Sequence, residues 1–185
     1  SVFSFMGRLA DISVDQSPDG REVDRGFRAI MFTDIVDYTA TTEALGDARA
    51  MELVRAHNDV VRNALRQYGG NEVKHTGDGM MASFGDSNQA LRGAADIQDR
   101  CRSNNLSIRI GISAGEPIQE DGDFFGSTVN LAARLCDAAG PGEVYLSTEF
   151  VDSIDNTVVE IEPVGEVPLK GFAEPQQVSR VSVSN

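Results

Sequence analysis

The apolar positions of this chain change period along its length, and they predict strands and helices in a definite order. An apolar run over residues 29–32 predicts a buried strand that ends near Asp34. A second strand is expected over residues 72–75 and a third over residues 80–84, with Gly77-Asp78-Gly79 between them. Glycine tolerates the positive φ angles of tight turns, so these two strands are predicted to form a hairpin.

Segments whose apolar residues have helical spacing lie between these strands and after them. A short helix is expected over residues 39–45, and a long one over residues 47–68, where apolar positions recur at i, i+3 and i+4 behind Asp47 as the cap. Further helices are expected from about residue 88 to 103 and from Ser127, as the cap, to residue 139. His57 lies within the first long stripe, which favours a core or interface histidine over a catalytic one.

Residues 107–115 alternate more regularly than any other stretch. Isoleucine or alanine occupies every second position and predicts a core face, while the opposite face carries small residues and the guanidinium of Arg109. We expect this small-residue face to leave room for a ligand. A polar loop is expected over residues 116–122.

Together the elements follow the order β-α-β-β-α-β, which predicts an α+β fold, a ferredoxin-like palm. The appended C-terminal elements are a short helix near Phe150 and strands around Val158 and Val178. Residues 27–185 suit one domain. Residues 1–26 have little periodicity and are expected to be a lead-in or linker, either disordered, strand-swapped or joined to an absent regulatory domain.

The composition excludes several classes of function. A net charge of −13 argues against a nucleic-acid partner, because a phosphate backbone requires a basic face. The sequence has no transmembrane run and no leader-like start, which predicts a globular protein in the cytoplasm. Cys101 and Cys136 are the only cysteines and indicate buried thiols rather than a disulfide or a zinc site. A first residue of Ser rather than Met is compatible with a part of a longer protein.

Asp34 and Asp78 carry the first chemical hypothesis. If the strand before Asp34 pairs beside the hairpin, the two carboxylates meet at one end of the sheet, where they repel unless a proton or a metal separates them. Such oxygen ligands suit Mg²⁺ or Mn²⁺ shared with a phosphate substrate. Taken alone, Asp78 fits equally well as an ordinary turn residue beside glycine.

Four sequence blocks, in order, resemble the catalytic domain of class III adenylate and guanylate cyclases, over about residues 27–181. The resemblance implies the nucleotidyl cyclase fold and an adenylate cyclase that converts ATP to 3′,5′-cyclic AMP and pyrophosphate. The blocks are Phe32-Thr33-Asp34-Ile35-Val36, Val73-Lys74-His75-Thr76-Gly77-Asp78-Gly79, Gly122-Asp123-Phe124-Phe125-Gly126-Ser127-Thr128-Val129-Asn130-Leu131-Ala132-Ala133-Arg134-Leu135 and Leu169-Lys170-Gly171.

The resemblance implies which residues bind the metal ions and which stabilise the transition state. In that family the aspartates matching Asp34 and Asp78 hold two divalent cations, Mg²⁺ or Mn²⁺, with help from the backbone carbonyl that matches Ile35. The residues matching Asn130 and Arg134 stabilise the transition state, in which the ribose 3′-hydroxyl attacks the α-phosphate.

The resemblance also assigns contacts with the substrate. The residues matching Lys74 and Asp123 read adenine, whose N1 accepts a hydrogen bond and whose N6 amine donates one. Positions matching Arg109 and Lys170 contact the triphosphate. Guanylate cyclases typically carry Glu and Cys at the two base-reading positions, so Lys74 with Asp123 implies ATP.

The family works as a head-to-tail homodimer with shared active sites, in which the metal aspartates come from one subunit and the other groups from its partner. The short loop over residues 116–122 resembles the short-armed bacterial subclass, and Asp37 stands where many members have Gly. The alternative function is a degenerate cyclase domain that binds nucleotide as a regulatory module without turnover. The Gly-Gly-Asp/Glu-Glu-Phe signature of diguanylate cyclases is missing from the sequence.

Overall fold

The structure is a computed structural model that describes residues 14–16, 22–24, 26–155 and 159–182. Its centre is one large sheet. The strands of this sheet are β3 (Arg28–Ile35), β4 (Gly70–His75), β5 (Gly79–Phe84), β6 (Ile108–Gly115), β9 (Val144–Ser147), β10 (Ile161–Val167) and β11 (Gln176–Val181). They lie in the order β10-β11-β9-β6-β3-β5-β4.

The four strands β6-β3-β5-β4 form the antiparallel ferredoxin-like core that the sequence predicts. Strand β9 joins the edge of this core parallel to β6, and β11 and β10 extend the sheet antiparallel beyond it. The appended strand predicted around Val178 is therefore confirmed as β11. The one predicted around Val158 falls outside the described residues, and β10 begins at Ile161.

The helices are α2 (Tyr38–Leu45), α3 (Asp47–Tyr68), α4 (Ser87–Ser103), α5 (Ser127–Ala138) and α6 (Thr148–Asp152). They agree with the predicted ranges, but two caps differ. Gly46 and Gly126, rather than Asp47 and Ser127, precede α3 and α5, so neither predicted side chain acts as the cap. Within the described chain, no helix combines the length and the apolar character needed to cross a membrane.

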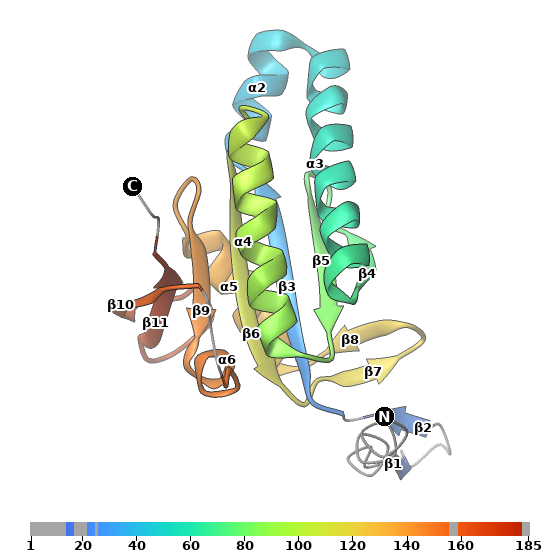
Figure 1. The fold of residues 1–185 in the computed structure, drawn as a ribbon, viewed down its shortest axis with the longest axis vertical. Helices are drawn as coiled ribbons and strands as arrows, with labels where there is room; N and C mark the ends of the chain where they lie inside the picture. The colour runs from blue at the N-terminus through green and yellow to red at the C-terminus, as the bar shows by residue number, and fades with distance from the viewer. Residues whose placement is uncertain (1–13, 17–21, 25, 156–158, 183–185) are drawn as a thin grey trace.

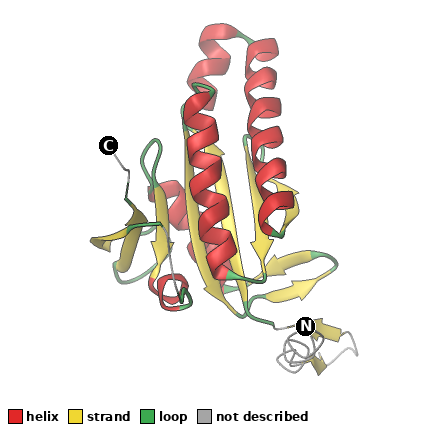
Figure 2. Ribbon diagram, viewed as in Figure 1, coloured by secondary structure: helices red, strands yellow, loops and turns green. Residues whose placement is uncertain are grey.

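The sheet separates two helical layers (Figures 1 and 2). Helices α3 and α4 run side by side over one face and enclose the larger core with the predicted isoleucine face of β6. Helix α5 lies on the opposite face. As predicted, His57 is fully buried, and both cysteines are buried and free. Burial raises the pKa of the Cys101 thiol to about 12.

The small-residue face of β6 does not leave room for a ligand, which corrects the sequence prediction. A Cβ atom on Gly111 would lie 2.2 Å from the backbone nitrogen of Cys136 and 2.4 Å from the carbonyl oxygen of Ala132. A Cβ atom on Gly115 would lie 2.4 Å from Oγ1 of Thr128. The missing side chain of Gly111 therefore allows the backbone of α5 to pack directly on the strand, and that of Gly115 leaves space for the side chain of Thr128.

The polar stretch after β6 is a hairpin and not a plain loop. Strands β7 (Ile118–Glu120) and β8 (Asp123–Phe125) pair antiparallel across a turn in which Asp121 and Gly122 both have positive φ. Part of the predicted lead-in is also ordered into strands. β1 (Val14–Gln16) pairs with β2 (Glu22–Asp24), and β2 pairs with β7, so these strands form a separate four-stranded sheet.

Candidate active site

Asp34 and Asp78 meet at one end of the sheet, as the sequence predicts. Asp34 pairs in register with Gly79, the residue that follows Asp78. The amide of Ile35 donates a hydrogen bond of 3.2 Å to the carbonyl of Asp78. The hairpin turn is closed by a 3.1 Å bond from the amide of Thr76 to the carbonyl of Gly79.

The two glycines of this turn have different roles. Gly77 has a φ of 82°, the left-handed conformation that was predicted for a tight turn. Gly79 is required for space instead, because a Cβ atom there would lie 2.0 Å from the carbonyl oxygen of Thr33. This close approach of β5 to β3 is what brings Asp78 beside Asp34.

A cavity of about 330 Å³ opens at the acidic pair. Burial raises the pKa of Asp34, and the neighbouring charge of Asp78 raises it further, while hydrogen bonds from Arg109 act in the opposite direction. Negative charge is therefore concentrated at this position. The lining residues are Phe32, Thr33, Asp34, Thr76, Asp78, Ala133, Cys136 and Asp137.

Arg109 neutralises part of this charge. It faces Asp34 across β3 and β6, and its Nε and Nη2 donate bonds of 3.0 and 2.6 Å to Oδ2 of Asp34. Its Nη1 donates a bond of 3.0 Å to the backbone carbonyl of Asp137 on α5. Arg109 was predicted to contact a triphosphate, and the structure places it at the edge of the acidic cavity, where it is bound to an aspartate.

The acidic pair has the donor set for a divalent cation. Among the described residues, no group of three or more His, Cys, Asp and Glu side chains is arranged to hold a metal ion. Mg²⁺, however, typically takes only one or two carboxylates and completes its shell with water and substrate phosphates. Two carboxylates, one with a raised pKa, and the nearby backbone of Ile35 fit that arrangement.

His57 supports the acidic strand from the other side of the sheet. One ring nitrogen, Nε2, shares a hydrogen bond of 2.8 Å with Oγ1 of Thr33, the residue before Asp34. The other, Nδ1, is 3.0 Å from Oδ1 of Asn58. The buried histidine therefore connects α3 to β3 next to the site, in agreement with the predicted core role.

Lys74 and Asp123, which are 49 residues apart in sequence, form a direct ion pair. Nζ of Lys74 on β4 lies 2.5 Å from Oδ2 of Asp123 on β8. Partial burial acts to raise the pKa of Asp123, but the bonds from Lys74 and from the amide of Phe124 outweigh it, so the pKa of this carboxyl is lowered. The structure thus brings together the two residues predicted to read a base.

Asn130 and Arg134 lie one turn apart on α5. Nη1 of Arg134 is 3.0 Å from Oδ2 of Asp137, whose backbone carbonyl also accepts from Arg109. Asn130 is exposed and lies three residues before Ala133, the first α5 residue that lines the acidic cavity, whereas Arg134 directly follows Ala133. Arg134 is therefore nearer than Asn130 to the part of α5 that borders the acidic cavity.

Lys170 lies in a turn between β10 and β11. The amide of Phe172 donates a 3.1 Å bond to the carbonyl of Leu169, and Gly171 has a φ of 86°. Leu169 is buried in the same apolar cluster as Leu135 of α5, and Lys170 beside it is exposed. No described contact joins Lys170 to the acidic pair or to Arg109 within one chain.

Sequence reasoning missed Asp137, Thr76 and Cys136, which all border the acidic cavity. Asp137 had a readable signal, because it stands three residues after Arg134 and can pair with it on a helix. Cys136 had no such signal. Its thiol lies 3.6 Å from the carbonyl of Arg109, and burial raises its pKa.

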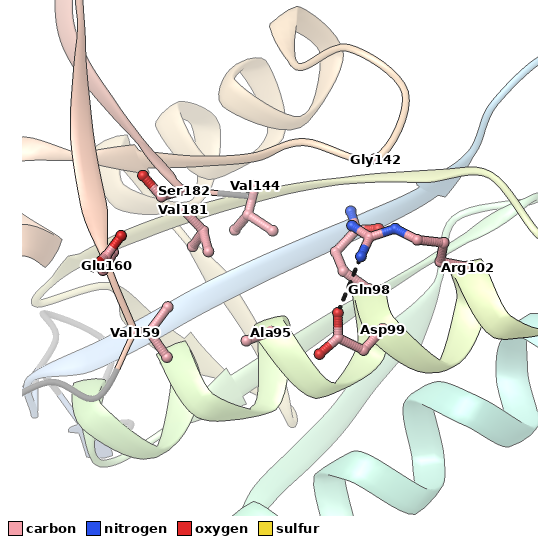
Figure 3. A pocket seen from close by; sticks show the side chains of 10 residues that line it. All are labelled: Ala95, Gln98, Asp99, Arg102, Gly142, Val144, Val159, Glu160, Val181 and Ser182. Carbon is pink, nitrogen blue, oxygen red and sulfur yellow. Dashed lines mark hydrogen bonds and ion pairs between the residues drawn. The ribbon is translucent and has the colours of Figure 1, made fainter. Parts of the chain in front are cut away.

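A second cavity, of about 370 Å³, lies between α4 and the β9–β11 side of the sheet (Figure 3). Arg102 at its rim is paired with Asp99 at 3.3 Å. The side-chain amide of Gln98 donates to the backbone carbonyls of Ile108 and Glu143 at 3.2 Å each. These polar groups already have partners, so this cavity offers less for a reaction than the acidic one.

Comparison with known sequences agrees with this geometry. A model of the adenylate and guanylate cyclase catalytic domain matches residues 26–182. An uncharacterised protein of Mycobacterium tuberculosis is 33% identical over 148 residues, which are 79% of this chain and 39% of that protein. The adenylate cyclase of Streptomyces coelicolor is 31% identical over 147 residues, which are 78% of this chain and 38% of that enzyme. The chain thus spans well under half the length of these relatives.

Solved structures show the same fold. The adenylyl cyclase CyaB from P. aeruginosa superposes with a TM-score of 0.80 at 25% identity, and the match covers 89% of this chain and 98% of that one. The adenylate/guanylate cyclase/hydrolase from Silicibacter pomeroyi superposes with a TM-score of 0.78 at 29% identity, and the match covers 88% of this chain and 99% of that one. The chain belongs to the family of adenylate and guanylate cyclase catalytic domains, and it has the nucleotidyl cyclase fold.

Proposed function

We propose that residues 27–185 form an adenylate cyclase catalytic domain that converts ATP to 3′,5′-cyclic AMP and pyrophosphate. The observation that carries this proposal is the 2.5 Å contact between Lys74 and Asp123. An ammonium can donate a hydrogen bond to adenine N1, and a carboxylate can accept one from the N6 amine, whereas guanine presents the reverse pattern. The relative in S. coelicolor, named an adenylate cyclase, supports this choice of substrate.

Asp34, Asp78 and the backbone carbonyl of Ile35 would hold two divalent cations, Mg²⁺ or Mn²⁺. When bound, such ions lower the pKa of the ribose 3′-hydroxyl and offset the charge of the leaving pyrophosphate. Arg109 and Lys170 would contact the triphosphate. The ion pair between Arg109 and Asp34 would then open as the nucleotide binds, because one guanidinium fork cannot serve both partners fully.

Cyclisation forms a bond between O3′ and the α-phosphorus and breaks the bond from that phosphorus to the oxygen bridging to the β-phosphate. The 3′-hydroxyl loses its proton to the surrounding water, and negative charge grows on the oxygens of the α-phosphate. Arg134, fixed on a helix, would stabilise that charge, and the amide of Asn130 would add a hydrogen bond.

We further propose that Asn130 and Arg134 act on the nucleotide held by the acidic pair of a second subunit, in a head-to-tail homodimer. In support, neither Asn130 nor Arg134 lines the acidic cavity of its own chain, although Ala133 on the same helix does. Sites built in this way come in symmetric pairs.

A degenerate domain that binds nucleotide without turnover is the second candidate. The ion pair between Arg109 and Asp34 favours it, because a protein cation already occupies a carboxylate that the reaction assigns to a metal. If the pair stayed closed, the nucleotide could still be held at Lys74 and Asp123.

The test is to incubate the purified protein with ATP or GTP and Mn²⁺ or Mg²⁺, and to measure the cyclic nucleotide and pyrophosphate. Adenylate cyclase activity predicts cyclic AMP and pyrophosphate in equal amounts from ATP, and far less product from GTP. Binding of ATP without any product would establish the degenerate domain instead. A preference for GTP would refute the assigned role of Lys74 and Asp123.

A further inference from the structure

Phe125 is a large apolar side chain that the fold leaves exposed beside the base-reading pair. Its exposed fraction is 48%, whereas that of the preceding Phe124 is 6%. Both belong to β8, where successive side chains point to opposite faces. Phe124 packs under the hairpin with Ile30 and Met81, so Phe125 points to the same face of β8 as Asp123.

The ammonium of Lys74 connects the ring to the carboxylate. Its Nζ is 2.5 Å from Oδ2 of Asp123 and 6.0 Å from the centroid of the Phe125 ring. An aromatic face, a cation and an anion thus border the same small region of the surface. A flat group that is held by its polar edge at Lys74 and Asp123 lies within reach of that ring.

We propose that Phe125 stacks on the purine of the nucleotide that Lys74 and Asp123 hold. This inference rests on the proposed function and adds a residue to its substrate site. Edge hydrogen bonds select the base, but each replaces a bond to water and adds little net affinity. Stacking on an aromatic face adds affinity and tolerates every base. Phe125 therefore supplies binding strength, while selectivity stays with the ion pair.

The competing explanation for the exposed ring is a contact with a second subunit. Ile118 pairs with Phe125 across the hairpin and is itself 38% exposed, so the two form a small apolar surface. A subunit contact and a base contact differ in what covers the ring. The first depends on protein concentration, and the second depends on nucleotide.

The chain contains no tryptophan, so Phe125→Trp introduces a single indole that reports on this position by its fluorescence. The ligand is 3′-deoxy-ATP with Mg²⁺, which lacks the attacking hydroxyl and cannot be cyclised. We expect saturable quenching of the indole fluorescence as the base stacks on the ring, and no quenching by inorganic tripolyphosphate. The matched control is Phe27→Trp, because Phe27 is similarly exposed, at 44%, but precedes β3 at the end opposite Asp34.

A second variant measures the contribution to affinity. We expect Phe125→Leu to bind 3′-deoxy-ATP about tenfold more weakly by calorimetry, a loss of about 1.4 kcal/mol, because the base loses its aromatic stacking partner. Binding of 3′-deoxy-GTP should weaken by a similar factor. Tripolyphosphate should bind wild type and Phe125→Leu with the same affinity. Equal affinity would show that the variant is folded.

The outcomes separate this proposal from the proposed function. Quenching in the Phe125→Trp variant, with no cyclic AMP made by the wild type, supports stacking and refutes the cyclase. Cyclic AMP production by wild type without quenching in Phe125→Trp, or unchanged affinity in Phe125→Leu, overturns stacking alone. The indole fluorescence of Phe125→Trp could instead change with protein concentration and not with added nucleotide. That result would also overturn stacking, in favour of a subunit contact. A wild type that binds no nucleotide refutes both proposals.

Discussion

Arg109 and Asp34 are direct partners across β6 and β3, with Nη2 2.6 Å from Oδ2. Both side chains are only partly exposed, at 30% and 22%. The carboxylate that is proposed to bind a metal therefore has a protein cation beside it whenever the site is empty. Any metal that binds there competes with the guanidinium.

The first prediction follows from this competition. Arg109→Gln should bind Mn²⁺ about tenfold more tightly in the absence of nucleotide, because a charge close to Asp34 is removed. ATP should bind more weakly, because a contact with the triphosphate is lost. Electron paramagnetic resonance of free Mn²⁺ measures the first effect. Arg100→Gln is the control, since Arg100 pairs with Asp96 on α4. Equal Mn²⁺ affinity in wild type and Arg109→Gln would disprove the competition.

The second prediction concerns the carboxylates themselves. Asp34→Asn and Asp78→Asn should each lose nearly all cyclase activity at saturating Mn²⁺, because two cations cannot be held by one carboxylate and a carbonyl. Asp37→Asn should stay active, since Asp37 is exposed and asparagine also tolerates its left-handed φ of 56°. More than a few per cent of activity in either site variant would contradict the two-metal assignment.

The third prediction concerns the choice of base. Lys74→Glu combined with Asp123→Cys should strongly reduce kcat/KM for ATP, because polar groups on adenine would lose their partners. The affinity for tripolyphosphate should not change, because the residues proposed to contact the triphosphate, Arg109 and Lys170, are left intact. Steady-state kinetics with ATP and GTP test this expectation. If the double variant used ATP as well as wild type does, neither residue would touch the base.

The fourth prediction tests the shared site. Asp34→Ala and Arg134→Ala should each be inactive, but a mixture of the two should regain about a quarter of the wild-type activity, because half of the random dimers are mixed and each restores one of its two sites. The recovery should rise with protein concentration as dimers form. A mixture that stays inactive, although heterodimers are shown to form, would place the whole site within one subunit.

The fifth prediction concerns pH. Burial lowers the pKa of His57 below its ordinary value of 6.5, despite the bond to Asn58. The unfolded chain therefore takes up a proton first as pH falls through 6.5, and the free energy of unfolding should fall with it, by up to about 1.4 kcal/mol per pH unit. Denaturant unfolding between pH 8 and 5 measures this slope, and His57→Gln should reduce it.

The control for this effect is the other histidine of the chain, His75, which is exposed on β4. His75→Gln removes an exposed imidazole and leaves His57 in place. If both variants showed the same slope as wild type, the pH dependence would not come from His57.

The sequence predicted the fold well because the periods of its apolar residues are regular. Strand β6 alternates strictly and α3 has a continuous stripe, so their buried faces could be assigned in advance. The meeting of Asp34 with Asp78 followed from the same reasoning, since pairing β3 beside a hairpin leaves few other positions for them. The pairing of Lys74 with Asp123, in contrast, was predicted only by resemblance.

The sequence did not predict correctly what covers the small-residue face of β6. A small residue such as Gly111 fits equally well under a ligand or under another backbone, and only the position of α5 decides between them. The partners of Arg109 were missed for a related reason, because a long side chain can reach several acids. Its bond to Asp34 depends on strand register, and its bond to Asp137 depends on where α5 ends.

The contact at Gly111 also limits how such a domain can be controlled. With no side chain between them, α5 and β6 pack through their backbones, and a side chain at Gly111 would push the helix away from the strand. Arg109 and Arg134 therefore lie on two elements that pack backbone to backbone. If the sites are shared between two subunits as proposed, a change in the orientation of one subunit against the other would move both guanidinium groups together.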